Sequence, residues 1–295
     1  KFRDIAVKTT EREKMIELHK SRWFFTAWKR CFQSIRHAKT FLPFVGYAVL
    51  QFVLLLVLVY FTYPPFASFL IPVVRKLYGE AALHYPNNFL VLPSLYAQFN
   101  LVLSGIVGIV VIGIATKMFE MIFKGSAPQL KSGVNATFPR YGQLFVVWLV
   151  ETVFILLFVV GLPLLLRKHT IENYQLARVV RLGCMFLGIL VGALFAYTSA
   201  LIILDRKGIF GSIARSLSIF RENAISTFFL IAIPTLLYFP INYVSQQSRF
   251  LVTKFNPEIV GFVLAIGILV SLIANYLMVG TVTMFYLWVT GRREY

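Results

Sequence analysis

The sequence predicts an all-α fold, a polytopic transmembrane helical bundle with about six spans, and three observations predict it. Of the 295 residues, 58% are apolar, and the mean hydropathy is +0.76. One water-soluble core cannot bury that much apolar surface, so the bilayer has to act as solvent. The apolar residues also gather in six long windows, and basic amphipathic stretches precede every second window.

Each window is long enough for a helix to cross the bilayer, which takes about 20 mostly apolar residues. The second and the last are longer than needed, so they can tilt or project from the membrane. The predicted spans run from Phe41 to Tyr63, Gln98 to Phe123, Gln143 to Leu166, Leu182 to Leu204, Ile225 to Tyr243 and Ile259 to Val289.

The longest connection between spans, Pro64 to Ser94, is rich in proline and aromatic residues. This composition predicts a loop that lies on the surface and contains a helical turn or two. Two interpretations stay open for it: a contact with a partner or lipid, or an ordinary amphipathic connection.

The distribution of Lys and Arg predicts the orientation. Of 29 such residues, 21 fall before the first span, at the end of the second or between it and the third, between the fourth and fifth, and after the sixth. Cytoplasmic segments carry the excess of positive charge, so both termini are expected in the cytoplasm. The cluster from Arg167 to Arg181 falls on the other side and is an exception to this rule.

Three similar segments suggest an internal repeat of one amphipathic helix and two spans. The approximate repeats are 27–125, 127–208 and 209–293, and basic residues with glycine close each of them, as in Phe123-Lys124-Gly125 and Arg206-Lys207-Gly208. We therefore expect two domains: a cytoplasmic, basic, amphipathic segment over 1–40 and a six-span domain over 41–295. Three helix pairs of similar composition would be the alternative.

The amphipathic stretches show helical periodicity. Apolar side chains recur at three and four residues within 208–222 and again within 22–39, and cationic residues flank them. Such helices lie in the membrane interface with the cations toward lipid phosphates. The alternative is that they are extensions of the following spans. The apolar stripes comprise Ile209, Phe210, Ile213, Leu217 and Phe220, and Phe24, Trp28, Phe32 and Ile35, with a poorer copy in Leu130, Val134 and Phe138.

The net charge of +17 indicates an acidic partner. Anionic lipid headgroups fit better than nucleic acid, because no soluble basic domain is left to bind nucleic acid. We expect a membrane protein partner or a second copy of the chain in addition. The expected headgroup contacts are Arg22, Lys29, Arg30, Arg36, Lys39, Arg206, Lys207 and Arg215.

No motif in the sequence carries catalysis. The four histidines are scattered without metal-ligand spacing, and no phosphate-binding or nucleophile motif is present. Cys31 and Cys184 lie in segments of different character, so neither a disulfide nor a metal site is expected. We therefore predict a protein that is not an enzyme and needs no cofactor.

One acidic residue, Glu151, lies inside a predicted span. A carboxylate in hydrocarbon costs roughly 2.5–3.5 kcal/mol and usually faces the bundle or a wet cavity. The repeat alignment places Gln51 at the same depth and Thr235 nearby, so the three can form a polar site near the axis. That site would serve either ions or protons, or only helix packing through hydrogen bonds.

Ala196 to Pro234 carries a family resemblance. There a span ends at Asp205, Arg206, Lys207 and Gly208, and an amphipathic helix with Ala214, Arg215 and Ser216 leads into the next span. This segment resembles the membrane domain of glycerophosphodiester phosphodiesterases and the YciC-like bacterial integral membrane proteins. The resemblance implies a six-helix membrane module without catalytic residues of its own, and a location in the bacterial cytoplasmic membrane.

Mitochondrial carriers also contain three repeats of two spans. Their signature places acidic and basic residues after a proline at the end of each odd span. The corresponding prolines here, Pro64, Pro163 and Pro240, lack those charged neighbours. The sequence therefore favours a non-catalytic protein that organises lipid or a membrane protein complex. A transporter or channel that uses Glu151 is the alternative, and an intramembrane enzyme comes third.

Overall fold

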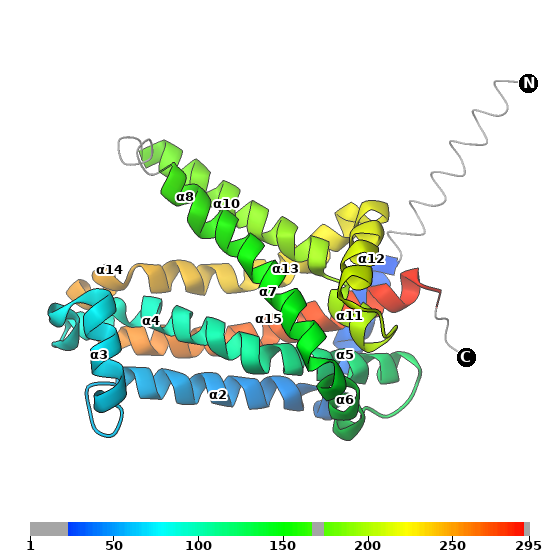
Figure 1. Ribbon diagram of the computed structural model, residues 1–295, viewed down its shortest axis with the longest axis horizontal. Coiled ribbons are helices and arrows are strands. Elements are labelled where there is room, and N and C mark those ends of the chain that lie inside the picture. The colour runs from blue at the N-terminus through cyan, green and yellow to red at the C-terminus, as the bar shows by residue number, and fades with distance from the viewer. Residues whose placement is uncertain (1–22, 167–173, 292–295) are drawn as a thin grey trace, which may run out of the picture. The chain divides into compact units, whose positions relative to one another are not determined.

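The computed structural model describes residues 23–166 and 174–291, and within them it is helical (Figure 1). Six of the described helices are long and apolar enough to cross a membrane, as the sequence predicted. They comprise Ala38–Val59, Asn87–Phe123, Leu130–Leu165, Gln175–Ile203, Ala224–Gln246 and Ile259–Val289. An integral membrane protein is therefore indicated. The threefold repeat stays a prediction.

Several of these spans consist of shorter helical segments. Two contain a π-helical turn, at Ser104–Gly108 and at Leu157–Gly161. The α-helices are α2 (Leu42–Val59), α3 (Ala67–Tyr78), α4 (Asn87–Leu103), α5 (Ile109–Phe123), α6 (Leu130–Thr137), α7 (Tyr141–Leu156), α8 (Leu162–Leu165), α10 (Tyr174–Phe195), α11 (Thr198–Ile203), α12 (Ile209–Glu222), α13 (Ala224–Gln246), α14 (Ser248–Lys254) and α15 (Ile259–Val289).

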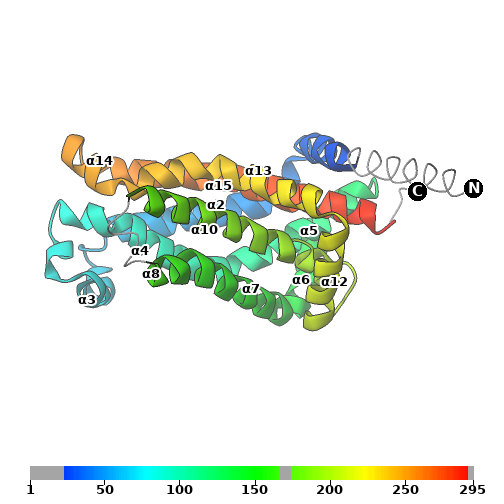
Figure 2. The same ribbon diagram turned by 90° about the horizontal axis from the view of Figure 1, so that it is seen from above.

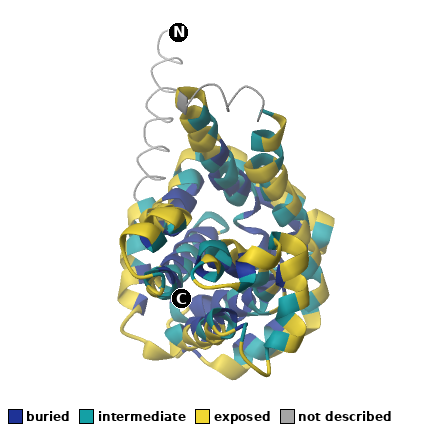
Figure 3. Ribbon diagram, turned by 90° about the vertical axis from the view of Figure 1, so that its left-hand side faces the viewer, coloured by how far each residue is buried: buried dark blue, intermediate teal, exposed yellow. Residues whose placement is uncertain are grey.

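The chain folds as two compact units. Of the described residues, the first holds 23–41, 112–166, 174–233 and 277–291, and the second holds 42–111 and 234–276. In each, buried residues face neighbouring helices and exposed residues lie on the outer sides (Figure 3).

The first unit contains all the predicted amphipathic stretches. Residues 23–34 form a helix, and this helix, α6 and α12 lie where α5 and α15 end (Figures 1 and 2). The interior of this unit includes aromatic side chains at Phe119, Tyr197, Phe285 and Tyr286.

The second unit is built on α2 and α4, which run side by side (Figure 1). Its core consists of aliphatic and aromatic side chains from both helices, together with residues of α3, α14 and α15. The amide of Gln51 on α2 donates to the Asn100 side chain on α4 at 2.8 Å, so the polar group within this core is satisfied.

The prediction of a loop over Pro64 to Ser94 was wrong. This segment contains the twelve-residue α3, and α4 already begins at Asn87, eleven residues before the predicted start of the second span. Pro72 and Pro93 lie inside helices. Each removes one backbone hydrogen bond, but buried residues such as Val74, Leu92 and Leu95 supply the packing that holds both helices.

The amphipathic stretches differ in how they join the following spans. A turn over 35–37 separates helix 23–34 from the first span. Asn223, with φ −137° and ψ 38°, separates α12 from α13. The helix from Leu130 instead runs through to Leu165 as one span-length unit. Between α6 and α7, however, lies a short 3-10 turn at Phe138–Arg140, whose last residue has φ −113° and ψ 9°.

Candidate functional site

Helix 23–34 packs on the first unit through its smallest side chains. Ala27, Cys31 and Ser34 are buried on one face. A Cβ atom on Gly280 of α15 would lie 2.6 Å from the sulfur of Cys31 and 2.9 Å from the Phe119 ring. Glycine is therefore needed there, since any larger residue would push the helix away.

The rest of the surface of helix 23–34 is divided into an apolar sector and a polar one. Phe25, Phe32 and Ile35 are exposed, Phe25 to 70%. Lys29 in the helix and Arg36 in the turn that follows are exposed as well, and each comes four residues after an exposed phenylalanine, which places it directly beside the apolar sector. The helix thus has three sectors: one against the protein, one apolar and open, and one cationic.

The sequence placed the apolar stripe of this helix only in part. Phe32 and Ile35 are exposed as expected, whereas Phe24 and Trp28 are half-buried. Phe25, which lies outside the predicted stripe, is the most exposed of the large apolar residues in this helix. The inward direction is set by the small residues, which a search for large apolar residues overlooks.

Helix α12 has the same three sectors. Ser212, Ser216 and Ile219 are buried against the protein. Ser216 Oγ donates a hydrogen bond to the Leu194 carbonyl at 2.7 Å and accepts one from the Tyr197 N–H at 3.3 Å. Ser216 therefore fixes α12 to the end of α10 through its hydrogen bonds.

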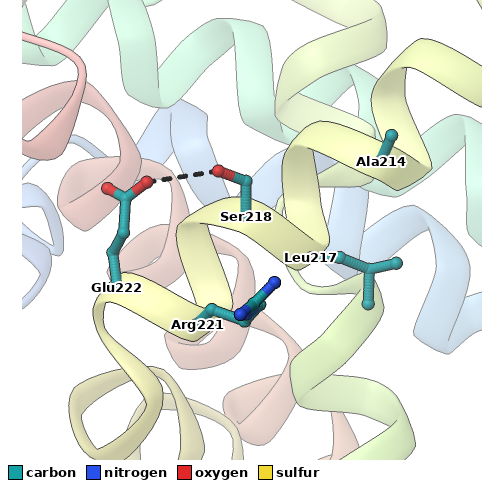
Figure 4. Close-up of a pocket in the computed structure, with 5 residues that line it drawn as sticks. All are labelled: Ala214, Leu217, Ser218, Arg221 and Glu222. Atoms are coloured by element: carbon teal, nitrogen blue, oxygen red, sulfur yellow. Dashed lines mark hydrogen bonds between the residues drawn. The ribbon is translucent and has the colours of Figure 1, made fainter.

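The open face of α12 carries apolar and cationic side chains side by side. Phe210 is 88% exposed and Leu217 is exposed too. A shallow hollow of about 530 Å³ lies on this face and is lined by Ala214, Leu217, Ser218, Arg221 and Glu222. Ser218 Oγ donates a hydrogen bond to the Glu222 carboxylate, and the Arg221 side chain points away from this pair (Figure 4).

The turn before α12 is held by a tyrosine that sequence reasoning missed. Tyr286 of α15 donates a hydrogen bond to the Asp205 carboxylate at 2.6 Å. The Lys207 N–H donates to the Leu201 carbonyl at 3.1 Å, with Arg206 in the left-handed region at φ +58°. The left-handed backbone of Arg206 ends the helix in a turn, and this turn directs Arg206 to the surface. No local pattern in the sequence links positions 205 and 286.

Helix α6 is attached by another close approach. A Cβ atom on Gly133 would lie 2.9 Å from the backbone carbonyl oxygen of Ile114 on α5. Beyond α6, the Arg140 guanidinium donates to the carbonyls of Ala136 and Ile203 at 3.2 and 3.4 Å. The lack of a side chain at Gly133 is what allows this contact.

The predicted headgroup contacts gather in the first unit. Arg22 lies outside the described residues. Lys29, Arg36, Lys39, Arg206 and Arg215 are exposed and Lys207 is half-buried. Arg30 lies 5.5 Å from the Phe123 ring centre and 5.9 Å from that of Trp288, and burial lowers the pKa of its guanidinium. Lys117 and Lys124 both pair with Glu120, at 2.6 and 2.8 Å.

The predicted intramembrane polar site is divided between the two units. Glu151 is half-buried on α7 of the first unit, and among the described residues its carboxyl has no hydrogen bond or salt bridge. Gln51 and Thr235 belong to the second unit. Gln51 pairs with Asn100, which the sequence analysis did not single out. A common site of the three stays a prediction.

Both cysteines are buried as free thiols. Burial raises the pKa of the Cys31 thiol to about 12. Over 23–166 and 174–291 no group of three or more His, Cys, Asp or Glu residues could hold a metal ion.

Comparisons with protein-family models, with curated proteins and with solved structures found no match. The site therefore has to be interpreted from its own geometry. That geometry joins a cationic sector and an apolar sector on each of two helices, helix 23–34 and α12, which are called the two basic helices below.

Proposed function

We propose that this chain is a non-catalytic integral membrane protein that organises anionic lipid, and through it a membrane protein complex, at one membrane surface. The observation that carries the proposal is the division of both basic helices into three sectors. A helix needs a protein-facing, an apolar and a cationic side only where protein, hydrocarbon and headgroups meet. The orientation expected from the charges makes this surface the cytoplasmic one.

The energetics favour anionic headgroups over neutral ones. Each Lys or Arg near an anionic membrane surface contributes about 1 kcal/mol, and the contribution falls with salt. The exposed cations Lys29, Arg36 and Lys39 cluster within a few turns of Phe32. By binding headgroups, these cations hold the apolar sector of helix 23–34 at the membrane interface.

The test is a lipid analysis of the purified protein. The full chain is extracted in mild detergent, and the phospholipids retained per protein molecule are quantified by mass spectrometry. Replacing Lys29, Arg36 and Lys39 together by Gln should remove most of the bound anionic lipid. The matched control replaces Lys76, Arg249 and Lys254 by Gln, which are equally exposed and belong to the second unit.

Equal loss of anionic lipid in both triple variants would contradict the proposal, since net charge alone would then explain binding. A stoichiometric protein that co-purifies with the native chain and is lost only from the first variant would support the wider role in a complex. Turnover of a substrate by the purified, partner-free protein would overturn the non-catalytic part of the proposal.

A second function, transport, has one observation in its favour. Glu151 lies within a span and has no hydrogen-bond or salt-bridge partner among the described residues. If Glu151 binds a transported ion or proton, Glu151→Gln should abolish flux into vesicles and leave assembly intact. Unchanged flux in this variant, or no flux in the native chain, would remove the transport hypothesis.

A further inference from the structure

The second unit contains a helix that crosses its spans. Helix α3 lies at the end of α2 and the beginning of α4 and runs crosswise to both (Figures 1 and 2). In a bilayer whose normal follows α2 and α4, this direction places α3 in the plane of the membrane surface.

The inner side of α3 is firmly attached to its unit. Val74 is completely buried, and Leu70 and Tyr78 pack against the same core. Tyr78 Oη and Ser94 Oγ are hydrogen bonded at 2.8 Å, which ties the end of α3 to α4. The direction in which the other sides of α3 face is therefore fixed.

The remaining surface of α3 has an apolar sector beside a polar one. Phe69, Val73 and Leu77 recur every four residues and are exposed, Phe69 to 77%. Ser68 and Arg75 are exposed on the side away from this sector, and Lys76 lies at the edge between the two. Exposed Tyr60 and Tyr63, between α2 and α3, add aromatic residues of the kind that lie at headgroup level.

Charge distinguishes α3 from the two basic helices. The Arg75 guanidinium forms a salt bridge with Glu80, so Lys76 is the cation of α3 outside that pair. Electrostatic attraction to anionic lipid is therefore small here, and burial of the apolar sector has to supply the binding energy.

We infer that α3 is a third membrane-surface helix, whose Phe69–Val73–Leu77 sector inserts into the lipid interface irrespective of headgroup charge. The inference rests on α3 alone and does not require the proposed function. It commits to lipid as the partner, because the polar sector and the neighbouring tyrosines match a lipid-water boundary. A protein partner would be an outcome of the test.

The test places an environment-sensitive fluorophore at Phe69→Cys and, separately, at Ser68→Cys in the full chain. Cys31 and Cys184 are buried, so the engineered thiols are labelled selectively. Each protein is reconstituted into vesicles of neutral phosphatidylcholine and into vesicles with added phosphatidylglycerol. Quenching by lipids spin-labelled near the headgroup is compared with quenching by iodide in the water.

The expected result is that the label at position 69 emits at shorter wavelength and loses most of its fluorescence to the spin-labelled lipid, equally in both vesicle types. The label at position 68 should be quenched by iodide instead. Iodide quenching at both positions would overturn the inference and leave the sector available to a protein. Lipid quenching at position 69 that requires phosphatidylglycerol would also overturn it.

Discussion

The two basic helices and α3 share one plan but are attached by different means. Helix 23–34 and α12 pack through small residues, with Gly280 beneath Cys31 and with Ser216 bonded to a backbone carbonyl. Helix α3 packs through larger side chains, such as Val74. The attachment of the basic helices therefore depends on close contacts between helices and on hydrogen bonds, whereas the attachment of α3 depends on the volume of its buried apolar side chains.

The largest loss of stability is expected at Gly280, where helix 23–34 packs closely on α15. In Gly280→Ala the new methyl group would overlap Cys31 and Phe119, and overpacking of this kind costs roughly 1–3 kcal/mol. Thermal unfolding in detergent should show the loss, and limited proteolysis should show release of helix 23–34. In Gly261→Ala, on the same α15, the nearest atom would be 3.7 Å away, so stability should hardly change. If the two variants unfold at the same temperature, close approach at Gly280 is not what attaches helix 23–34.

Loss of volume should affect α3 next. Val74→Ala removes two buried methyl groups, which costs about 2 kcal/mol including the cavity. Its neighbour Val73 is 40% exposed, so Val73→Ala should have a much smaller effect on the unfolding temperature. If Val73→Ala destabilises the protein as much as Val74→Ala does, the inner side of α3 has been assigned wrongly.

Replacing two tyrosines, one at a time, compares the hydrogen bonds near α12 and at the end of α3. Tyr286→Phe removes the buried hydrogen bond to Asp205, and a bond to a charged group contributes about 1.5 kcal/mol. Tyr78→Phe removes the bond to Ser94, which is exposed, so water can replace it. Denaturation curves should therefore separate the first variant from the native chain and leave the second close to it. A greater loss in Tyr78→Phe would reverse the comparison.

The smallest effect concerns the thiol under helix 23–34. Because burial raises the Cys31 pKa to about 12 from an ordinary value of 9.0, the folded state holds this proton more tightly than the unfolded state. The contribution to stability is complete below pH 9.0 and is lost as the pH rises toward 12. At neutral pH iodoacetamide should leave Cys31 unmodified in peptide maps and should modify the exposed Gln33→Cys. Rapid modification of Cys31 under the same conditions would show that the helix is not seated.

Much of the fold followed from the sequence, because long apolar windows leave few alternatives to membrane-spanning helices. The amphipathic periodicity likewise located α12, and its bounds differ by one residue from the predicted start. The start of α4 could not be predicted, because the proline-rich segment before it is stabilised by packing of Val74 and Leu92, which composition does not reveal.

The charged residues of the candidate site were predictable from the sequence, but the directions in which the faces of its helices point were not. The sequence identified the cations, but the inward faces are set by Ala27, Cys31, Ser212 and Ser216, which are too small to stand out in a search for apolar stripes. Phe25 was missed for this reason. The bond between Tyr286 and Asp205 joins positions far apart in the chain, so no local pattern could announce it.

The most direct test of the central claim measures the depth of the two open sectors of α12. Spin labels are attached at Phe210→Cys and at Arg215→Cys in the full chain, reconstituted into vesicles that contain anionic lipid. Accessibility to oxygen, which concentrates in hydrocarbon, is compared with accessibility to a water-soluble nickel complex. We expect oxygen access at position 210 and nickel access at position 215. Nickel access at both positions would contradict the central claim, because α12 would then stand in water away from the membrane.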